Sequence, residues 1–211
     1  MTADDLRNAR ATLGEVWGLG RPITYAEMGR ALRLASRRSG DAVWRWETTT
    51  GPTGPASVAI NAWLDGTRPR MPVDTITDPD TPCLPPMTGA DLRAARAAIG
   101  RLWGLRRPLH YTEIGRLLRL SSTNPGLSVR KWERSSPTGP ASAAIEAVLD
   151  GARPRAPLAD ILSGRAAVTK IEAYAPEHEL PDWDDLRGRA PDAAGDMSSE
   201  AFVRELRDGW H

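Results

Sequence analysis

The sequence predicts an all-α protein made of two tandem copies of one helical unit. Three observations lead to this prediction. Residues 1–70 recur as residues 87–155, apolar residues within each copy recur at spacings of three and four, and no segment alternates apolar and polar residues as a half-buried strand does. We therefore expect two tandem domains of four to five helices each.

The internal repeat is the strongest feature of the chain. The stretch ADDLRNARATLGEVWGLGRPITYAEMGRALRL returns as GADLRAARAAIGRLWGLRRPLHYTEIGRLLRL, displaced by 86 residues, and PTGPASVAINAWLDGTRPR returns as PTGPASAAIEAVLDGARPR, displaced by 85. Roughly six in ten aligned positions are identical. Since solenoids usually need at least three repeats, we expect each copy to bury its own small core or to pack against its twin.

Each copy opens with an amphipathic helix. Leu6, Ala9, Leu13 and Trp17 fall at spacings of three and four, which places them on one helical face. Gly18 follows directly and ends the helix. The second copy repeats this spacing, so we expect the same helix there.

A second helix follows in each copy. Thr24 and Glu27 form a capping-box pattern, in which the hydroxyl and the carboxylate satisfy free backbone amides at the helix start. Gly29 and Gly115 lie inside this helix. Because a helical glycine costs about 1 kcal/mol relative to alanine, these two glycines need a reason, and close packing is one.

A third and a fourth helix complete the unit. Val43 points inward and Trp44 outward in the third helix, which begins near Asn124 in the second copy. The motif Thr-Gly-Pro-Ala opens the fourth helix, and Asp-Gly closes it. After the second copy, Leu158 and Ile161 predict one further helical turn.

Charge divides the chain into four parts, although the net charge is only +1. Residues 1–70 carry ten basic and seven acidic side chains, and residues 87–155 carry twelve and five. Residues 71–86 hold five prolines and three acids, which predicts an extended acidic linker, and residues 156–211 form an acidic tail. Two basic blocks indicate a polyanionic partner.

The composition excludes several kinds of site. Cys83 is the single cysteine and the chain has three histidines, which is too few for a disulfide framework or a metal centre. No stretch reaches the ~18 uncharged apolar residues of a membrane helix. No nucleophile stands with a base, and no glycine-rich phosphate loop is present. We therefore expect no enzyme activity, no cofactor and no membrane contact, and a location in the reducing cytoplasm.

Three motifs carry a resemblance to a known family. Each copy contains L-R-x-x-R-x-x-L/I-G, then Y-x-E-M/I-G-R-x-L, then V-x-x-W-E. These motifs resemble the lambda-repressor/Cro-like (XRE-type) helix-turn-helix family over both copies. The resemblance implies two helix-turn-helix domains whose third helices lie in the DNA major groove. It also implies structural ion pairs that hold those helices in place. The pairs are Arg10–Glu47 and Arg96–Glu133.

The resemblance assigns DNA contacts to the second copy. Base contacts are expected from the third helix and phosphate contacts from the second. The residues are Tyr111, Arg116, Asn124, Leu127, Ser128, Arg130, Lys131 and Arg134. Arg130 or Lys131 is expected to bind O6 and N7 of a guanine, which is worth about 1–3 kcal/mol of discrimination. A merely solvated charged face is the alternative interpretation of these residues.

The equivalent positions of the first copy have a different chemistry. They are Tyr25, Arg30, Asp41, Ala42, Trp44 and Arg45. Trp44 stands where the second copy has Arg130, so it either contacts thymine methyl groups or packs against the other copy. Because the outward residues differ, we expect the two copies to bind different half-sites.

The acidic tail holds a candidate partner-binding element. Phe202, Leu206 and Trp210 recur every four residues and form an apolar stripe long enough to enter a groove. The sequence leaves three possible binding partners for this stripe: the basic blocks of the same chain, a second copy of the chain in a homodimer, or another protein such as RNA polymerase.

These observations favour a sequence-specific regulator of transcription that binds double-stranded DNA through two heads in one chain. A sixteen-residue linker extended at ~3.1 Å per residue reaches ~50 Å. That reach exceeds the ~34 Å between half-sites one duplex turn apart. The alternative is a protein-interaction adaptor that kept the helical unit without strong DNA binding.

Overall fold

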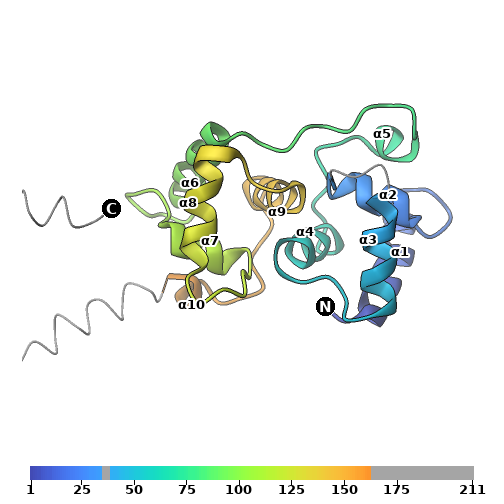
Figure 1. Ribbon diagram of the computed structural model, residues 1–211, viewed down its shortest axis with the longest axis horizontal. Coiled ribbons are helices and arrows are strands. Elements are labelled where there is room, and N and C mark those ends of the chain that lie inside the picture. The colour runs from blue at the N-terminus through green and yellow to red at the C-terminus, as the bar shows by residue number, and fades with distance from the viewer. Residues whose placement is uncertain (35–38, 163–211) are drawn as a thin grey trace, which may run out of the picture. The chain divides into compact units, whose positions relative to one another are not determined.

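A computed structural model describes residues 1–34 and 39–162, which form ten α-helices and no strand (Figure 1). The all-α prediction is confirmed for these residues. Repeat 1 consists of α1 (Ala3–Val16), α2 (Tyr25–Ala31), α3 (Ser39–Thr48), α4 (Gly54–Leu64) and α5 (Val73–Thr77). Repeat 2 consists of α6 (Gly89–Leu102), α7 (Tyr111–Leu117), α8 (Pro125–Ser135), α9 (Gly139–Leu149) and α10 (Leu158–Leu162).

The capping box predicted at the start of α2 is present. The backbone N–H of Glu27 donates to the Thr24 hydroxyl at 3.2 Å, and the N–H of Thr24 donates to the Glu27 carboxylate at 2.7 Å. In repeat 2 the Glu113 carboxylate accepts from the N–H of His110 at 2.7 Å. Both helices therefore begin with a glutamate that satisfies a free amide.

Within each repeat, the second and third helices pack closely. A Cβ atom added to Gly29 of α2 would lie 2.7 Å from the Cβ of Ser39, and one added to Gly115 of α7 would lie 2.6 Å from the Cβ of Pro125. Real side chains do not approach so closely, so both positions require glycine. The predicted reason for the two helical glycines is confirmed.

The apolar faces predicted from the spacing are buried. Leu6, Leu13, Met28, Val43 and Trp63 are among the core residues of repeat 1, and their repeat-2 counterparts lie in the same hydrophobic cluster. That cluster is continuous across both repeats. The sequence left open whether each repeat buries its own core or packs against its twin. In the structure each repeat buries residues of its own and also packs against its twin.

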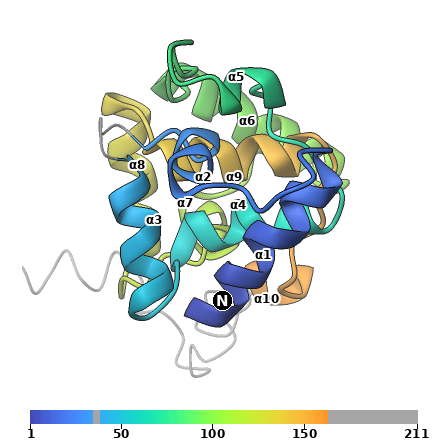
Figure 2. The same cartoon turned by 90° about the vertical axis from the view of Figure 1, so that its right-hand side faces the viewer.

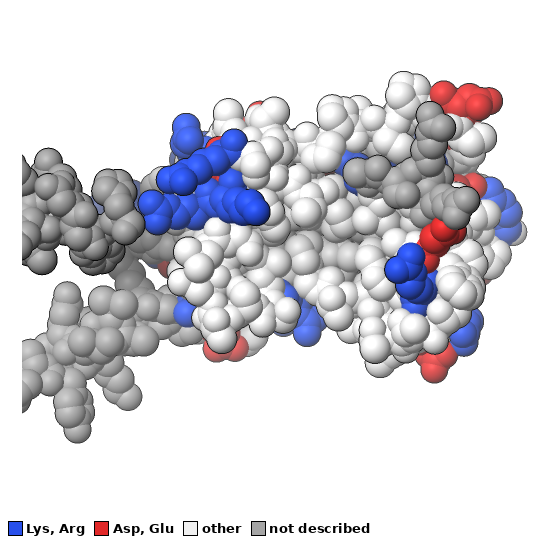
Figure 3. Space-filling model, viewed as in Figure 1, with Lys and Arg blue, Asp and Glu red and all other residues white. Residues whose placement is uncertain are grey.

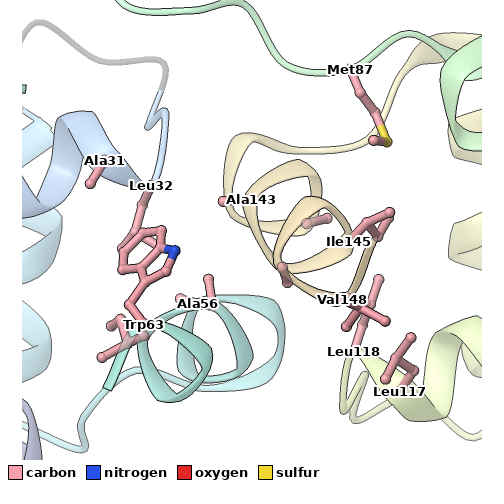
Figure 4. Packing of buried hydrophobic residues seen from close by; sticks show 14 of the residues in the cluster. Ala31, Leu32, Ala56, Trp63, Met87, Leu117, Leu118, Ala143, Ile145 and Val148 are labelled. Carbon is pink, nitrogen blue, oxygen red and sulfur yellow. The ribbon is translucent and has the colours of Figure 1, made fainter. Parts of the chain in front are cut away.

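Helices α4 and α9 form the junction between the repeats (Figures 1 and 4). On one side of the junction Arg70 pairs with Asp150 at 3.0 Å, and on the other Arg155 pairs with Asp65 at 2.9 Å. Each partner lies 85 residues from its equivalent, so the two ion pairs are related by the repeat. The junction therefore has the reciprocal pairing of a twofold interface inside one chain.

The segment after α4 differs from the extended linker that the prolines predict. Residues 73–77 form α5, which packs on α2 with Ile76 buried, and Met71 just before it is buried as well. Helix α10, which was predicted as a helical turn, packs on α7 in the same way and buries Ile161. Both turns follow a proline and place isoleucine four residues after it, so they belong to the repeat. The repeated unit thus has five helices and continues past residue 70.

Candidate nucleic-acid interface

Helices α3 and α8 lie on the same face of the two-repeat unit. In Figure 1 both run upright in front of their neighbours, and after the 90° turn of Figure 2 both lie at the left-hand side. The packing of α4 on α9 joins the repeats that carry them. A partner that contacts the outer surface of one helix therefore meets that of the other on the same side.

A cluster of three polar side chains fixes α3 against α1 and α2. Arg10 Nη1 donates to Glu47 Oε2 at 2.6 Å, and the hydroxyl of Tyr25 donates to Glu47 Oε1 at 3.1 Å. The Arg10 guanidinium lies over the Tyr25 ring, 4.0 Å from its centroid, and its Nε donates to the carbonyl of Ile23 at 2.7 Å. Side chains from α1 and α2 thus meet on one carboxylate of α3.

Repeat 2 contains the same cluster. Arg96 Nη1 pairs with Glu133 of α8, and the hydroxyl of Tyr111 donates to Glu133 Oε2 at 2.9 Å. Arg96 lies 4.0 Å from the centroid of the Tyr111 ring, and its Nε donates to the carbonyl of Leu109 at 2.8 Å. The structure therefore contains both ion pairs that the family resemblance implied, with a tyrosine added to each.

Both carboxylates of these clusters stay ionised in the folded protein. Burial raises the pKa of Glu47, but the hydrogen bond and the charge of Arg10 outweigh it, so the pKa lies below its ordinary value. Burial likewise raises the pKa of Glu133, and the hydrogen bonds from Arg96 and Tyr111 reverse that effect. A charged group held by several donors fixes the tilt of a short helix firmly.

A second ion pair fixes the start of α2 and of α7. Arg21 donates to both carboxylate oxygens of Glu27 at 2.9 and 2.6 Å, and Arg107 does the same to Glu113 at 2.8 and 2.6 Å. The hydrogen bond from Arg21 lowers the pKa of Glu27. Burial raises the pKa of Glu113, but Arg107 brings it below its ordinary value. The loop before each helix is thereby fastened to its first turn.

The outer face of α8 is basic. Arg130, Lys131 and Arg134 are exposed, and none of them has an ion-pair partner among the described residues. Figure 3 shows Lys and Arg side chains gathered over this part of repeat 2. Leu127, near the start of the helix, is 60% exposed, and Ser128 is half-buried. These cations are available to an anionic partner.

The start of α8 differs in one detail from the predicted cap. Asn124 holds the N-cap position, but its side chain makes no capping hydrogen bond, and it is exposed. Pro125 occupies the first helical position, as the sequence predicts. The Asn124 amide is thus left open to solvent or to a ligand.

The outer face of α3 is mixed in charge. Trp44 is 51% exposed, and Asp41 and Arg45 are exposed beside it. Ala42 is half-buried. Figure 3 shows acidic and basic atoms next to each other over α3, unlike the basic patch over α8. The two outer faces are chemically different, as their sequences indicate.

Four residues expected at phosphates are engaged with the protein itself. The hydroxyls of Tyr25 and Tyr111 donate to Glu47 and Glu133, so a phosphate would have to compete with a carboxylate for them. Arg30 donates to the carbonyls of Thr75, Ile76 and Thr81 at 2.6–3.0 Å, and Arg116 donates to that of Ile161 at 3.2 Å. These two arginines fasten α5 and α10 to the second helix of their repeats.

Sequence reasoning missed the ion pairs between the repeats. Besides the two reciprocal pairs, Arg33 donates to both carboxylate oxygens of Glu146 at 3.0 and 2.7 Å. The repeated motif D-G-x-R-P-R was visible in both copies, and its Asp and second Arg form the reciprocal pairs. Nothing in one copy alone indicates that its partner is in the other.

One expected feature lies outside the described residues. Phe202, Leu206 and Trp210, the candidate partner-binding stripe, fall outside residues 1–34 and 39–162. Within that described part, no group of three or more His, Cys, Asp or Glu side chains is arranged to hold a metal ion. In the same part of the chain, no helix combines the length and the apolar character needed to cross a membrane.

Comparison with known proteins supplies no relative for this arrangement. No protein-family model, no curated protein and no solved structure matches the chain.

Proposed function

We propose that the chain is a sequence-specific, double-stranded DNA-binding regulator of transcription, with α3 and α8 as two recognition helices of one molecule. The observation that carries this proposal is the presence of both helices on one face, each held by a buried glutamate. A duplex offers successive major grooves on one side about one helical turn apart, which suits two helices joined in this way.

The chemistry of the two helices suits two different tasks. Arg130, Lys131 and Arg134 provide the cations that bind phosphates and the donors that bind guanine edges. Trp44 provides an apolar surface for thymine methyl groups, and Arg45 adds one cation. We infer that α8 supplies most of the affinity and that the two helices bind unlike half-sites.

Titration of random-sequence duplex DNA with the full chain tests the electrostatic part of this proposal. The logarithm of the affinity is expected to fall linearly with the logarithm of the salt concentration, by about 0.9 for each phosphate that is neutralised. Lys131→Ala, which removes one exposed cation of α8, is expected to reduce that slope by about one.

Arg101→Ala is the matched control, because Arg101 is an exposed arginine at the end of α6, outside both proposed recognition helices. It is expected to leave the slope unchanged. A flat salt response of the unmodified chain, or an equal change from Lys131→Ala and Arg101→Ala, would contradict the assignment of α8 to DNA.

One observation favours a second candidate function. Trp44 and Leu127 are large apolar side chains exposed on the outer faces of α3 and α8. Exposed aromatic and aliphatic anchors are typical of protein-binding surfaces. A protein-interaction adaptor would therefore use the same face, and it would bind a protein partner stoichiometrically while having negligible affinity for duplex DNA.

A further inference from the structure

The repeat creates two equivalent positions at the junction of α4 and α9, one beside Arg33 and one beside Arg119. The position beside Arg33 is filled by side chains. Arg33, at the end of α2, donates to both carboxylate oxygens of Glu146 on α9 at 3.0 and 2.7 Å, and it is only 6% exposed. Trp63 and Met71 line the same place, and the space that remains has a volume of about 10 Å³. This side of the junction holds an ion pair and an aromatic ring in close packing.

The other place is hollow. By the repeat, Arg33 corresponds to Arg119, Glu146 to Asn61, Trp63 to Val148, and Met71 to Ala156. Three of these replacements remove a carboxylate, an indole ring and a thioether. The corresponding cavity has a volume of about 290 Å³. The difference in volume therefore has an identifiable cause in the sequence.

Figure 4 shows the two environments together. The indole of Trp63 extends from α4 toward Leu32, at the end of α2. Val148 lies on α9 next to Leu118, at the end of α7. Because valine has no ring, the groups that close the first place are missing from the second.

Three polar side chains of the cavity have no partner among the described residues: Asn61, Arg119 and Arg153. Asn61 is only 9% exposed, and its amide has no hydrogen-bond partner among the described residues. Arg119 lines the same cavity and has no carboxylate partner there, and Arg153 adds a second cation. Arg155 and Asp65 also line it but pair with each other at 2.9 Å. The cavity thus carries an excess of positive charge and an amide that no other described side chain engages.

We propose that this cavity binds a small aromatic carboxylate. The filled place shows which groups complete such a site: a ring where Trp63 lies and a carboxylate on the arginine where Glu146 lies. In the hollow place the ligand's carboxylate accepts hydrogen bonds from Arg119 and Asn61, and its ring contacts the apolar walls. Those walls are formed by Val58, Ala62, Leu117 and Val148.

The size of the cavity agrees with this class of ligand. Ligand sites commonly have volumes of about 300–1,000 Å³, and an apolar cavity of about 150 Å³ binds benzene. A volume of about 290 Å³ therefore accommodates a one- or two-ring molecule with a short acidic side chain. The bound molecule contacts α4, α7 and α9, so it joins the repeats as the Arg33–Glu146 pair does on the other side.

Calorimetric titration of the full chain with indole-3-acetate tests the proposal, with indole and acetate as the two partial probes. We expect saturable binding of one molecule per chain, and at least tenfold weaker binding of each partial probe. Arg119→Gly removes the cation at a residue whose φ is +53°, a backbone conformation that glycine adopts readily. This variant is expected to weaken binding at least tenfold.

A second variant closes the cavity instead of removing its charge. Asn61→Glu combined with Val148→Trp copies the side chains of the filled place and is expected to abolish binding while raising the melting temperature. Arg101→Ala is the control and is expected to bind normally. Three results would each overturn the proposal: absence of saturable binding, equal binding of indole and indole-3-acetate, or normal binding by folded Arg119→Gly protein. None of them depends on whether α3 and α8 bind DNA.

Discussion

Arg33 and Glu146 form a buried ion pair that joins the two repeats. The guanidinium donates to both carboxylate oxygens, at 3.0 and 2.7 Å, and it also donates to the carbonyl of Pro85 at 3.2 Å. At the equivalent place of repeat 2, Arg119 and Asn61 line one cavity, and Arg119 has no carboxylate partner among the described residues. The junction is therefore reciprocal in its packing and its exposed ion pairs, but only one side has a buried ion pair.

Glu146→Gln is expected to lower the free energy of unfolding by about 3–5 kcal/mol, because it leaves the buried Arg33 charge uncompensated. Chemical denaturation followed by circular dichroism measures this loss. Asp150→Asn is the matched control: it removes one partner of an exposed pair with Arg70, and it should cost about 1 kcal/mol or less. Similar losses in both variants would show that the buried pair does not hold the repeats together.

Gly139→Ala is expected to destabilise the junction by about 1–3 kcal/mol or more, because its Cβ would lie 1.9 Å from the carbonyl oxygen of Arg33. The backbone of one repeat would have to move away from the other. Gly18→Asn is the control, since nothing lies within 4 Å of an added Cβ and asparagine tolerates the positive φ of +77°. Thermal denaturation of both variants compares them, and an unchanged melting temperature for Gly139→Ala would contradict the contact.

Tyr111→Phe separates a structural role of this hydroxyl from a DNA-binding role. Loss of the 2.9 Å hydrogen bond to Glu133 is expected to cost about 1 kcal/mol of stability. Affinity for DNA, measured at a temperature where the variant is folded, is expected to change less than about twofold, because the hydroxyl already donates to Glu133 and is not free for a phosphate. A large loss of affinity with no loss of stability would show instead that the hydroxyl contacts a DNA phosphate.

Stability is expected to fall in acid. Glu27, Glu47, Glu113 and Glu133 have pKa values lowered in the folded protein, so the unfolded chain takes up protons first as the pH decreases. Their contribution is present above the ordinary glutamate pKa of about 4.3 and is lost as the pH falls through the lowered values. Denaturation curves recorded from neutral to acidic pH measure this dependence. Glu133→Gln should flatten it, and stability that stays constant in acid would exclude the effect.

The sequence predicted the parts of the fold that depend on local spacing. Leu6, Ala9 and Leu13 are buried as their spacing indicates, and Gly29 has the close helix contact that its position requires. Helix α5 was not predicted, because the five prolines and three acids of residues 71–86 indicate an extended linker. Its one buried apolar residue, Ile76, is recognised as part of the repeat only when α5 is compared with α10.

The junction and part of the candidate site could not be predicted in the same way. Arg30 lies on a helix of a basic block, and only the position of α5 shows that its guanidinium is engaged by backbone carbonyls. The pairing of Arg33 with Glu146 depends on how two whole repeats pack, and 113 residues separate the partners. Spacing along the chain carries no signal for such contacts.

Selection of bound fragments from a pool of random duplex DNA by the full chain tests the central claim most directly. Two unlike half-sites at one fixed spacing are expected to be enriched, because α3 and α8 differ in their outer residues and are joined through α4 and α9. Arg130→Ala is expected to relax the preference in one half-site only, whereas Arg101→Ala leaves both intact. A pool that stays random after selection, or a preference that Arg130→Ala and substitutions of Trp44 leave unchanged, would contradict the account.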